Sequence, residues 1–523
     1  MHRHAAGGAR KLCMRHALSA DIRQSLFAFW RNVGEQRWRG IRVCRPGRVF
    51  RRALMMWVVA LPMHALAALP VGWQAALQQA QLPADSIALW VQPVEGGAPL
   101  ISHRADQAMN PASVMKLVTT YAALEALGPA YRWKTEVYAR GSVQQGVLSG
   151  DVLIKGYGDP ALDVPALWQL LQQLQQQGIQ RISGNLLLDG SIFAPSVGQG
   201  PVLDNEPWRA YNAQPSPWLL NGRHTSFRFQ VERAEGRARI VVQPEFALPE
   251  IQVVNTLQPR AGPCNDWRSD LRYSITPMPS PNDERVTVAF SGTLPEQCDT
   301  RYLELSILSD TQYLWASFKL LWQQLGGQFN GRVQRGELRA DDRLLVRWQS
   351  PPLEQVVRDI NKWSNNVMAR QLMLTIGLEA GMAPVDEASA ALSVQHTLRQ
   401  CGLQFPELVL DNGAGLSRQA RISAEHLGQL LVTAYQRPLM PMFLASLPVL
   451  GVDGTTQKRL TAPETRGMGY LKTGSLEGVS SLAGYVQNRQ GKRFVVVMMV
   501  NHPHAAAMRP LQDRLLQQLI AGL

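Results

Sequence analysis

The sequence predicts an α+β protein whose core is an antiparallel sheet flanked by helices, interrupted by a large and mostly β insertion. Three observations support this fold class. Apolar, strand-like runs follow one another near the end of the chain. A strongly capped helix lies between residues 110 and 128. From about residue 134 to 350, short strands with turn signals replace this pattern. The 523 residues suffice for two or three domains.

We interpret residues 1–67 as a leader that contains a secretory signal peptide. Residues 1–53 hold 13 of the 53 Lys and Arg residues, and an apolar run from Leu54 to Ala67 follows. This order, ending in small residues, predicts cleavage after Ala67 and export to the periplasm. The run is short for a membrane span, so no transmembrane anchor is expected after cleavage. A translation start near Val49 and a long cytoplasmic arm both remain open.

The net charge of +13 lies mostly in this leader. The remaining residues carry nearly equal numbers of basic and acidic side chains, so no nucleic-acid partner is expected. The ten His residues are scattered along the chain and do not have the spacing of metal ligands. The sequence therefore predicts neither a metal site nor another cofactor.

Three cysteines follow the leader. Cys264 and Cys298 lie in a stretch rich in Pro, Asp and Ser, and an exported protein can keep a disulfide. We expect these two residues to be bonded. Cys401 is then expected to be a buried free thiol.

The first well-defined helix is expected to begin at Asn110 and to end at Gly128. Asn110 is a favourable N-cap residue, Pro111 suits the first helical position, and Gly128 stops the helix. This places Ser113 in the first turn and Lys116 on the same face, one turn further along. The helix also carries an apolar stripe with helical spacing, formed by Val114, Leu117, Val118, Tyr121, Leu124 and Leu127.

The insertion, residues 134–350, is expected to contain two nested subdomains. Val152–Ile154, a Gln-rich helix over 165–177 and Ile182–Leu188 predict one strand–helix–strand unit. Beyond Pro201, short strands separated by turn signals predict a mostly β unit. These strands are expected at Phe227–Val231, Ile240–Gln243 and Val286–Ser291.

Two apolar runs after the insertion, Leu353–Ile360 and Val367–Leu378, predict helices that meet at a polar junction. Near the end of the chain, Gly469–Gly474, Ser480–Val486 and Arg493–Val500 predict an antiparallel meander with one apolar face. The first of these strands is expected at an edge of the sheet, where an extended substrate could pair with it.

Three short strings lie at the ends of these elements: Ser113-Val-Met-Lys116, Ser364-Asn-Asn366 and Lys472-Thr-Gly474. A serine hydroxyl becomes a good nucleophile when a neighbouring base takes its proton, and a buried lysine can be that base. Each string alone also fits a structural role. These roles are a buried helix, an N-cap and a charged sheet edge. The combination and its order favour chemistry, because penicillin-binding proteins and class A β-lactamases carry this motif set.

With these strings in place, the chain resembles the D-alanyl-D-alanine carboxypeptidase/endopeptidase type of penicillin-binding protein, class C of low molecular mass (peptidase family S13). The resemblance covers the chain from about Ala68 to its end. Asn365 departs from the Asp that the family usually has at this position, and its side chain is expected to point away from the cleft. The other blocks are Asn110-Pro-Ala-Ser-Val-Met-Lys-Leu117, Gly156-Tyr-Gly-Asp-Pro160, Asp411-Asn-Gly-Ala-Gly-Leu-Ser-Arg418, Leu447-Pro-Val-Leu-Gly-Val-Asp-Gly-Thr455 and Lys472-Thr-Gly-Ser-Leu-Glu-Gly-Val479.

The resemblance implies a serine β-lactamase/transpeptidase-like core made of residues 68–133 and 351–523. It also implies acyl transfer on peptidoglycan peptides and inhibition by β-lactam antibiotics. The implied catalytic residues are Ser113 as nucleophile, Lys116 as base, Ser364 as proton relay and Asn366 as orienter. The implied substrate-binding residues are Lys472, Thr473, Gly474, Ser475 and Glu206, with the N–H groups of Ser113 and Ser475 as the oxyanion hole.

Several alternatives remain open at this point. A β-lactamase or esterase could use the same core, although the sequence names no deacylating group. A non-catalytic cell-wall binding module is a third possibility, which retention of all three strings disfavours. Carboxypeptidase and endopeptidase action both fit the sequence, and so does any oligomeric state.

Overall fold

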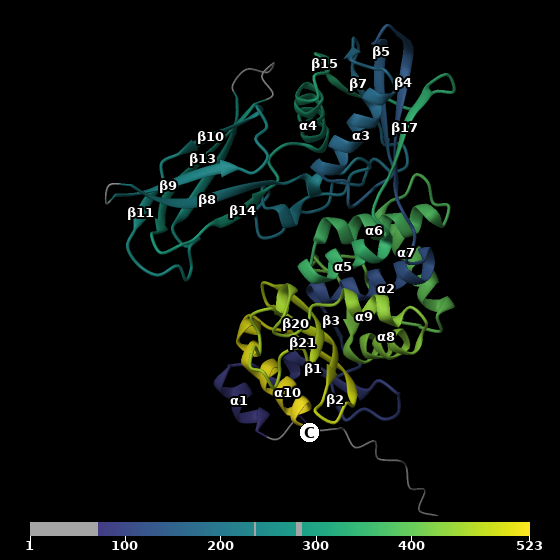
Figure 1. Cartoon of the computed structure of the whole chain (residues 1–523). Coiled ribbons are helices and arrows are strands. Elements are labelled where there is room, and N and C mark those ends of the chain that lie inside the picture. Colours follow the sequence, from purple (N-terminus) through teal and green to yellow (C-terminus); the bar gives the residue numbers. More distant parts are fainter. Residues whose placement is uncertain (1–68, 70–71, 235–236, 279–284, 523) are drawn as a thin grey trace, which may run out of the picture. The chain divides into compact units, whose positions relative to one another are not determined.

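The computed structural model describes residues 69, 72–234, 237–278 and 285–522 (Figure 1). All of them belong to one compact unit, His64–Leu523. The expected leader, residues 1–67, lies outside the described residues. Among the helices that are described, none is both long and apolar enough to cross a membrane.

The central sheet has five antiparallel strands in the order β19-β20-β21-β1-β2. The C-terminal strands are β19 (Gly469–Leu476), β20 (Val479–Gln487) and β21 (Arg493–Asn501). β1 (Ile87–Pro93) and β2 (Ile101–His103) come from the start of the described chain and complete the sheet. The predicted antiparallel meander is confirmed, and β19 lies at an edge.

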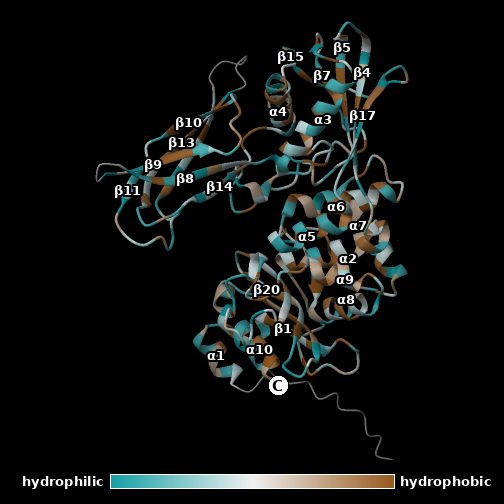
Figure 2. Cartoon of the chain, viewed as in Figure 1, coloured by the Kyte–Doolittle hydropathy of each residue, from teal (hydrophilic) through white to brown (hydrophobic). Residues whose placement is uncertain are grey.

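The expectation of one apolar face is wrong, because both faces of the sheet are covered. Alternate side chains of β21 enter two different hydrophobic clusters. One face packs against α8 (Ala424–Gln436), and the other packs against α10 (Arg509–Ala521) and α1 (Trp73–Gln79). A strand buried on both faces has a continuous apolar run, as β21 has, and an alternating pattern is typical of a half-exposed strand. Figure 2 shows both hydrophobic and hydrophilic residues on α10, which covers the sheet from outside.

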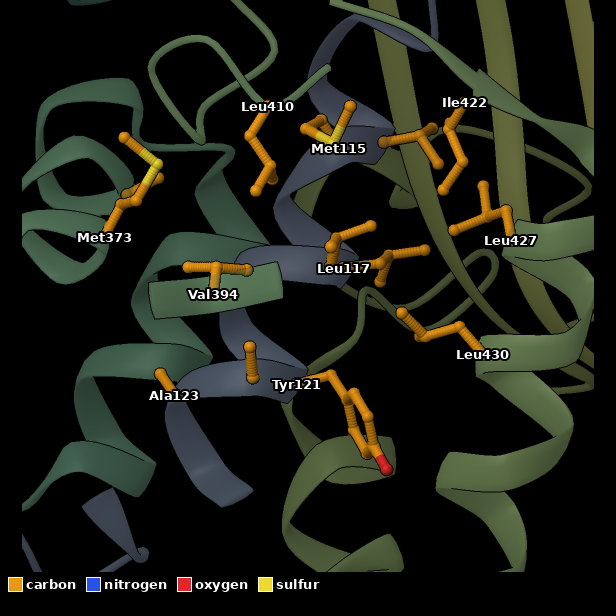
Figure 3. Packing of buried hydrophobic residues seen from close by; sticks show 14 of the residues in the cluster. Met115, Leu117, Tyr121, Ala123, Met373, Val394, Leu410, Ile422, Leu427 and Leu430 are labelled. Atoms are coloured by element: carbon orange, nitrogen blue, oxygen red, sulfur yellow. The ribbon is translucent and has the colours of Figure 1, made fainter. Parts of the chain in front are cut away.

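A group of helices packs against one side of the sheet around α2 (Lys116–Leu127). Every residue from Lys116 to Leu124 is buried, so α2 is a central helix and not one with a single buried stripe. Figure 3 shows Met115, Leu117 and Tyr121 among buried side chains that include Met373, Val394 and Leu427. The neighbouring helices are α8, α5 (Leu353–Trp363), α6 (Asn366–Glu379), α7 (Glu387–Gln400) and α9 (Met440–Ser446).

The α-helix begins later than expected. A 3-10 turn, Ala112–Met115, precedes α2, which starts at Lys116. The N-cap position of the turn is Pro111, not Asn110 as expected; the Asn110 side chain accepts a hydrogen bond from the N–H of Ala112 and holds the chain where the turn begins. The short pairing of β3 (Ala108–Met109) with β18 (Ile422–Ser423) fixes the chain just before it. The φ angle of Ala112 is +45°, which a regular α-helix does not allow.

The first part of the insertion forms a seven-stranded sheet. β5 (Val147–Gly156) is followed by α3 (Val164–Gln176) and then by β6 (Arg181–Ile182) and β7 (Leu186–Asp189), both parallel to β5. This confirms the predicted strand–helix–strand unit. The sheet also contains β4 (Lys134–Gln144), β15 (Gln328–Phe329), β16 (Val333–Arg335) and β17 (Arg343–Gln349), and α4 (Asp310–Gln324) packs with α3.

The second part of the insertion consists of two smaller sheets. In its core, Phe290 contacts both Phe227 and Phe229 edge to face. Cys264 and Cys298 form a disulfide in this region, whereas Cys401 is a free, partly buried thiol elsewhere in the chain. One sheet has β8 (Thr225–Ala234), β9 (Arg237–Pro244) and β14 (Arg301–Leu305), and the other has β10 (Ile251–Asn255), β11 (Gln258–Arg260), β12 (Leu271–Pro277) and β13 (Val286–Pro295).

Candidate active site

Ser113 and Lys116 lie at the junction between the 3-10 turn and α2. Their spacing of three residues places both side chains on one face. The Nζ atom of Lys116 lies 3.0 Å from the Oγ atom of Ser113. The Lys116 side chain is completely buried. The turn and the helix together therefore hold an amine within hydrogen-bond distance of a serine hydroxyl.

Two further acceptors surround the Lys116 amine. Its Nζ atom donates to Oδ1 of Asn366 at 2.6 Å and to the carbonyl oxygen of Ala414 at 2.6 Å. A neutral amine has two N–H donors and one lone pair. The two acceptors can therefore take both donors, and the lone pair is left for the hydroxyl proton of Ser113. Burial, followed by the positive charge of Lys472, holds the pKa of Lys116 well below its ordinary value. This arrangement suits a general base.

The loop that carries Ala414 is a part of the site for which sequence analysis assigned no role, although it lies in the block Asp411–Arg418. The Asn412 side chain accepts from the N–H of Ala414 at 3.0 Å, and Thr119 of α2 donates to the carbonyl oxygen of Gly413 at 2.7 Å. A Cβ atom on Gly415 would lie only 1.8 Å from the carbonyl oxygen of Ala112. Close packing on the turn that contains Ser113 thus requires a glycine at this position.

The junction between α5 and α6 supplies the second group of residues. Ser364 ends α5 in the left-handed region, with a φ angle of 59°. Asn365 accepts from the N–H of Met368 and is the N-cap of α6, so its side chain serves the helix. Asn366, the first residue of α6, contacts Lys116 through Oδ1 and donates from Nδ2 to the carbonyl oxygen of Tyr211.

Lys472 brings the third string into the same cluster. Its Nζ atom donates to Oγ of Ser364 at 2.8 Å and to the carbonyl oxygen of Thr473 at 2.8 Å. The side chain is completely buried, and this burial lowers the pKa of Lys472 to about 7. Two buried amines, Lys116 and Lys472, therefore flank the two serine hydroxyls.

The outer edge of β19 passes close to Ser113. A Cβ atom on Gly474 would lie 3.0 Å from the backbone nitrogen of Ser113 and 2.6 Å from the carbonyl oxygen of Pro111, so only glycine allows this approach. The N–H of Leu471 points outward, to Pro448. Alternation along the strand turns the N–H groups of Thr473 and Ser475 outward as well. The N–H of Ser475 therefore lies on the same open edge that passes the backbone nitrogen of Ser113.

Glu206 does not join this cluster. Its carboxylate accepts a hydrogen bond from the hydroxyl of Tyr273 in the insertion. Asp204, which sequence analysis did not single out, pairs with Arg418 at 3.4 Å. Arg418 also donates to the carbonyl oxygen of Glu477, just beyond β19. An exposed group of charges thus lies near the far end of the strand that carries the third string.

Among the residues that the structure describes, no group of three His, Cys, Asp or Glu side chains could hold a metal ion. The chemistry of this cluster is that of hydroxyl, amine and amide groups.

The sequence matches a family model and several known proteins. The family model described as "D-Ala-D-Ala carboxypeptidase 3 (S13) family" matches residues 73–519. A D-alanyl-D-alanine carboxypeptidase from Actinomadura sp. (strain R39) is 28% identical over 511 residues, which cover 90% of this chain and 91% of the relative. D-alanyl-D-alanine carboxypeptidase DacB from Haemophilus influenzae is 26% identical over 396 residues, covering 75% of this chain and 80% of the relative.

The fold has a counterpart among solved structures. Penicillin binding protein 4 (dacB) from Haemophilus influenzae superposes with a TM-score of 0.68 at 23% sequence identity. The match covers 85% of this chain and 99% of the solved chain. The expected fold, a transpeptidase-like core with an antiparallel sheet flanked by helices, is therefore confirmed.

Proposed function

The chain belongs to the D-Ala-D-Ala carboxypeptidase 3 (S13) family and is a serine peptidase, and from this premise we propose which residues carry the reaction. Ser113 is the nucleophile, Lys116 the general base, Ser364 the proton relay and Asn366 the group that orients Lys116. The observation that supports this assignment best is the 3.0 Å contact between the buried Lys116 amine and the Ser113 hydroxyl.

In the acylation step, Ser113 Oγ attacks the carbonyl carbon of the penultimate D-Ala, and Lys116 takes the hydroxyl proton. The oxygen of the tetrahedral intermediate accepts from the N–H groups of Ser113 and Ser475. The C–N bond then breaks, and the leaving amine of the terminal D-Ala takes a proton from Ser364. Ser364 is re-protonated by the Lys116 ammonium, which returns the proton taken from Ser113 and becomes the neutral base again. Lys472, which donates a hydrogen bond to Ser364, keeps its charge for the substrate carboxylate. Water then hydrolyses the acyl-enzyme.

In the binding step, the substrate extends along the outer edge of β19. Gly474 permits the close approach, and Lys472 and Thr473 hold the terminal carboxylate. The stem peptide extends toward the exposed charges of Asp204 and Arg418. Glu206, which the family resemblance assigns to the stem peptide, lies two residues from Asp204 and belongs to the same loop.

The substrates that fit this site are peptidoglycan stem peptides and their D-Ala cross-links, so both carboxypeptidase and endopeptidase action are included. β-Lactam antibiotics acylate Ser113, because their strained amide and carboxylate resemble the terminal dipeptide. The protein acts in the periplasm after removal of a signal peptide. Residues 68–133 and 351–523 form the catalytic domain, and residues 134–350 form the accessory region with two nested subdomains.

The decisive experiment measures covalent labelling and peptide turnover together. Purified protein is incubated with penicillin, and the peptide that contains Ser113 is examined by mass spectrometry for the adduct. D-Ala release from purified muropeptides is followed in parallel. Rapid penicillin turnover would favour a β-lactamase, and a folded protein without an adduct would favour a binding module.

The export proposal has its own test. N-terminal sequencing of protein from the periplasmic fraction should give Ala68 as the first residue. Exported protein that retains the residues before Leu54 would contradict the signal-peptide assignment.

A further inference from the structure

The segment from Pro448 to Thr455 has no role in the mechanism above, although sequence analysis singled out the block that contains it. It follows α9 and runs beside the outer edge of β19. The N–H of Leu450 donates to the carbonyl oxygen of Gly469 at 2.9 Å, and the N–H of Leu471 donates to the carbonyl oxygen of Pro448 at 2.8 Å. The segment therefore covers the first three residues of the edge strand.

An ion pair between buried Lys362 and partly exposed Asp453 holds the segment in place. The Nζ atom of Lys362 lies 2.6 Å from a carboxylate oxygen of Asp453, and the Lys362 side chain is only 7% exposed. The other carboxylate oxygen of Asp453 accepts from the N–H of Val449 at 2.7 Å. A Cβ atom on Gly454, whose φ angle is 56°, would lie 2.7 Å from the carbonyl oxygen of Lys362. The segment is thus tied to the last turn of α5, two residues before Ser364.

The segment ends in a contact with the proposed carboxylate site. The Oγ1 atom of Thr473 donates a hydrogen bond to the Oγ1 atom of Thr455 at 2.8 Å. A hydroxyl can donate one hydrogen bond and accept another. When a carboxylate occupies the site, the Thr473 hydroxyl can turn its proton to the carboxylate, and Thr455 then donates to Thr473, the reverse of the direction in the free site. The second hydroxyl then directs the first one and strengthens its hydrogen bond.

The uncovered edge of β19 is short on one side of Ser113 and long on the other. Ser113 lies beside Gly474, and the covered part of the strand ends at Leu471. A strand rises ~3.3 Å per residue, so about 10 Å of open edge remains on this side. That length suits one terminal residue. On the other side, the strand continues past Ser475 toward Arg418 and offers room for the stem peptide.

We propose that Pro448–Thr455 is a stop for the leaving group and that Thr455 is a positioning residue, which selects a free carboxylate through Thr473. This inference rests on the proposed function and deepens it. The stop limits the leaving side to one residue, and the paired hydroxyls favour a substrate that ends in a carboxylate. The segment that joins α9 to the sheet edge thus requires a free carboxylate on the leaving residue, which a terminal D-Ala has and which a residue cross-linked through its side chain also keeps.

The test compares three probes: an N-acetylated tripeptide ending in D-Ala-D-Ala, its C-terminal methylamide, and the same peptide extended by one Gly. Wild-type protein should cleave the free acid with a kcat/KM at least about tenfold above the other two, since the site pairs polar groups with the carboxylate. In Thr455→Val, KM for the free acid should rise roughly fivefold to tenfold, while kcat changes less than about twofold. Thr455→Ser should restore KM.

A matched control is Thr461→Val, which makes the same change at an exposed position of the following loop and should leave all constants unchanged. Wild-type protein that cleaves the Gly-extended peptide as fast as the free acid overturns the stop. An unchanged KM for the free acid in Thr455→Val overturns the role of Thr455. An equal rise in KM in the Thr455→Val and Thr455→Ser variants overturns it as well. A wild-type protein without D-Ala release and without a Ser113 adduct refutes instead the proposed function.

Discussion

Replacement of Lys116 by methionine tests the proposed base most directly. The thioether has nearly the length of the lysine side chain but can neither take the hydroxyl proton nor donate a hydrogen bond. Ser113 keeps its position in the 3-10 turn, because the turn is held by Asn110 and by the packing of Gly415. Any loss of acylation is then a loss of base chemistry.

The contacts of Lys116 allow the loss of acylation rate and the loss of stability to be estimated separately. Removal of a general base typically costs a factor on the order of 10² to 10⁴ in rate. For stability, the buried carbonyl oxygen of Ala414 loses its donor, which costs ~1–3 kcal/mol, and the partly buried Oδ1 of Asn366 loses a donor at a smaller cost. Removing an amine that burial disfavours in its charged form offsets part of this cost. We therefore expect a strong kinetic defect in a protein that still unfolds cooperatively.

The assay measures the rate of penicillin acylation by intact-protein mass spectrometry, and thermal unfolding by circular dichroism. Lys492→Met, at an exposed position in the turn between β20 and β21, is the matched control and should acylate at the wild-type rate. Acylation of folded Lys116→Met at a rate within tenfold of wild type would refute the assignment of Lys116 as the base.

Three further predictions concern other parts of the molecule. Ser113→Ala should abolish both the penicillin adduct and D-Ala release with little change in stability, and an adduct in this variant means that another serine is the nucleophile. KM for a peptide with a free carboxylate should rise as pH increases through about 7, because Lys472 loses its charge above its pKa; the methylamide should not show this rise, and equal pH profiles for both would contradict a carboxylate contact. Reduction of the bond between Cys264 and Cys298 should lower the free energy of unfolding by ~3 kcal/mol, as denaturant titration with and without reductant would show. Equal midpoints would contradict this contribution.

Much of the fold could be predicted from local patterns. The strands β19 to β21, the helices on either side of Ser364 and the strand–helix–strand unit of the insertion all follow from the spacing of apolar residues and from turn signals. Strand β1 did not emerge from such patterns. It is short and joins the sheet through β21, which lies some four hundred positions later in the sequence.

The segment around Ser113 shows what local sequence signals cannot predict. Capping rules placed its start at Asn110, but the chain first makes a 3-10 turn and becomes α-helical at Lys116. The 3-10 turn is in contact with residues that lie far away in the sequence. Gly415 packs on the carbonyl oxygen of Ala112, and Gly474 approaches the N–H of Ser113. No pattern within residues 110–128 contains information about these neighbours.

By itself, the sequence determined the motif residues, their order and the reactive groups that they supply, because these depend only on residue type and spacing. Only the tertiary structure decided which groups surround each of them. The carbonyl oxygen of Ala414 at Lys116, the Thr455 hydroxyl at Thr473 and the pairing of Asp204 with Arg418 all come from loops. A backbone oxygen exists at every residue and threonine is common, so such partners become recognisable only when folding brings distant segments within hydrogen-bond distance.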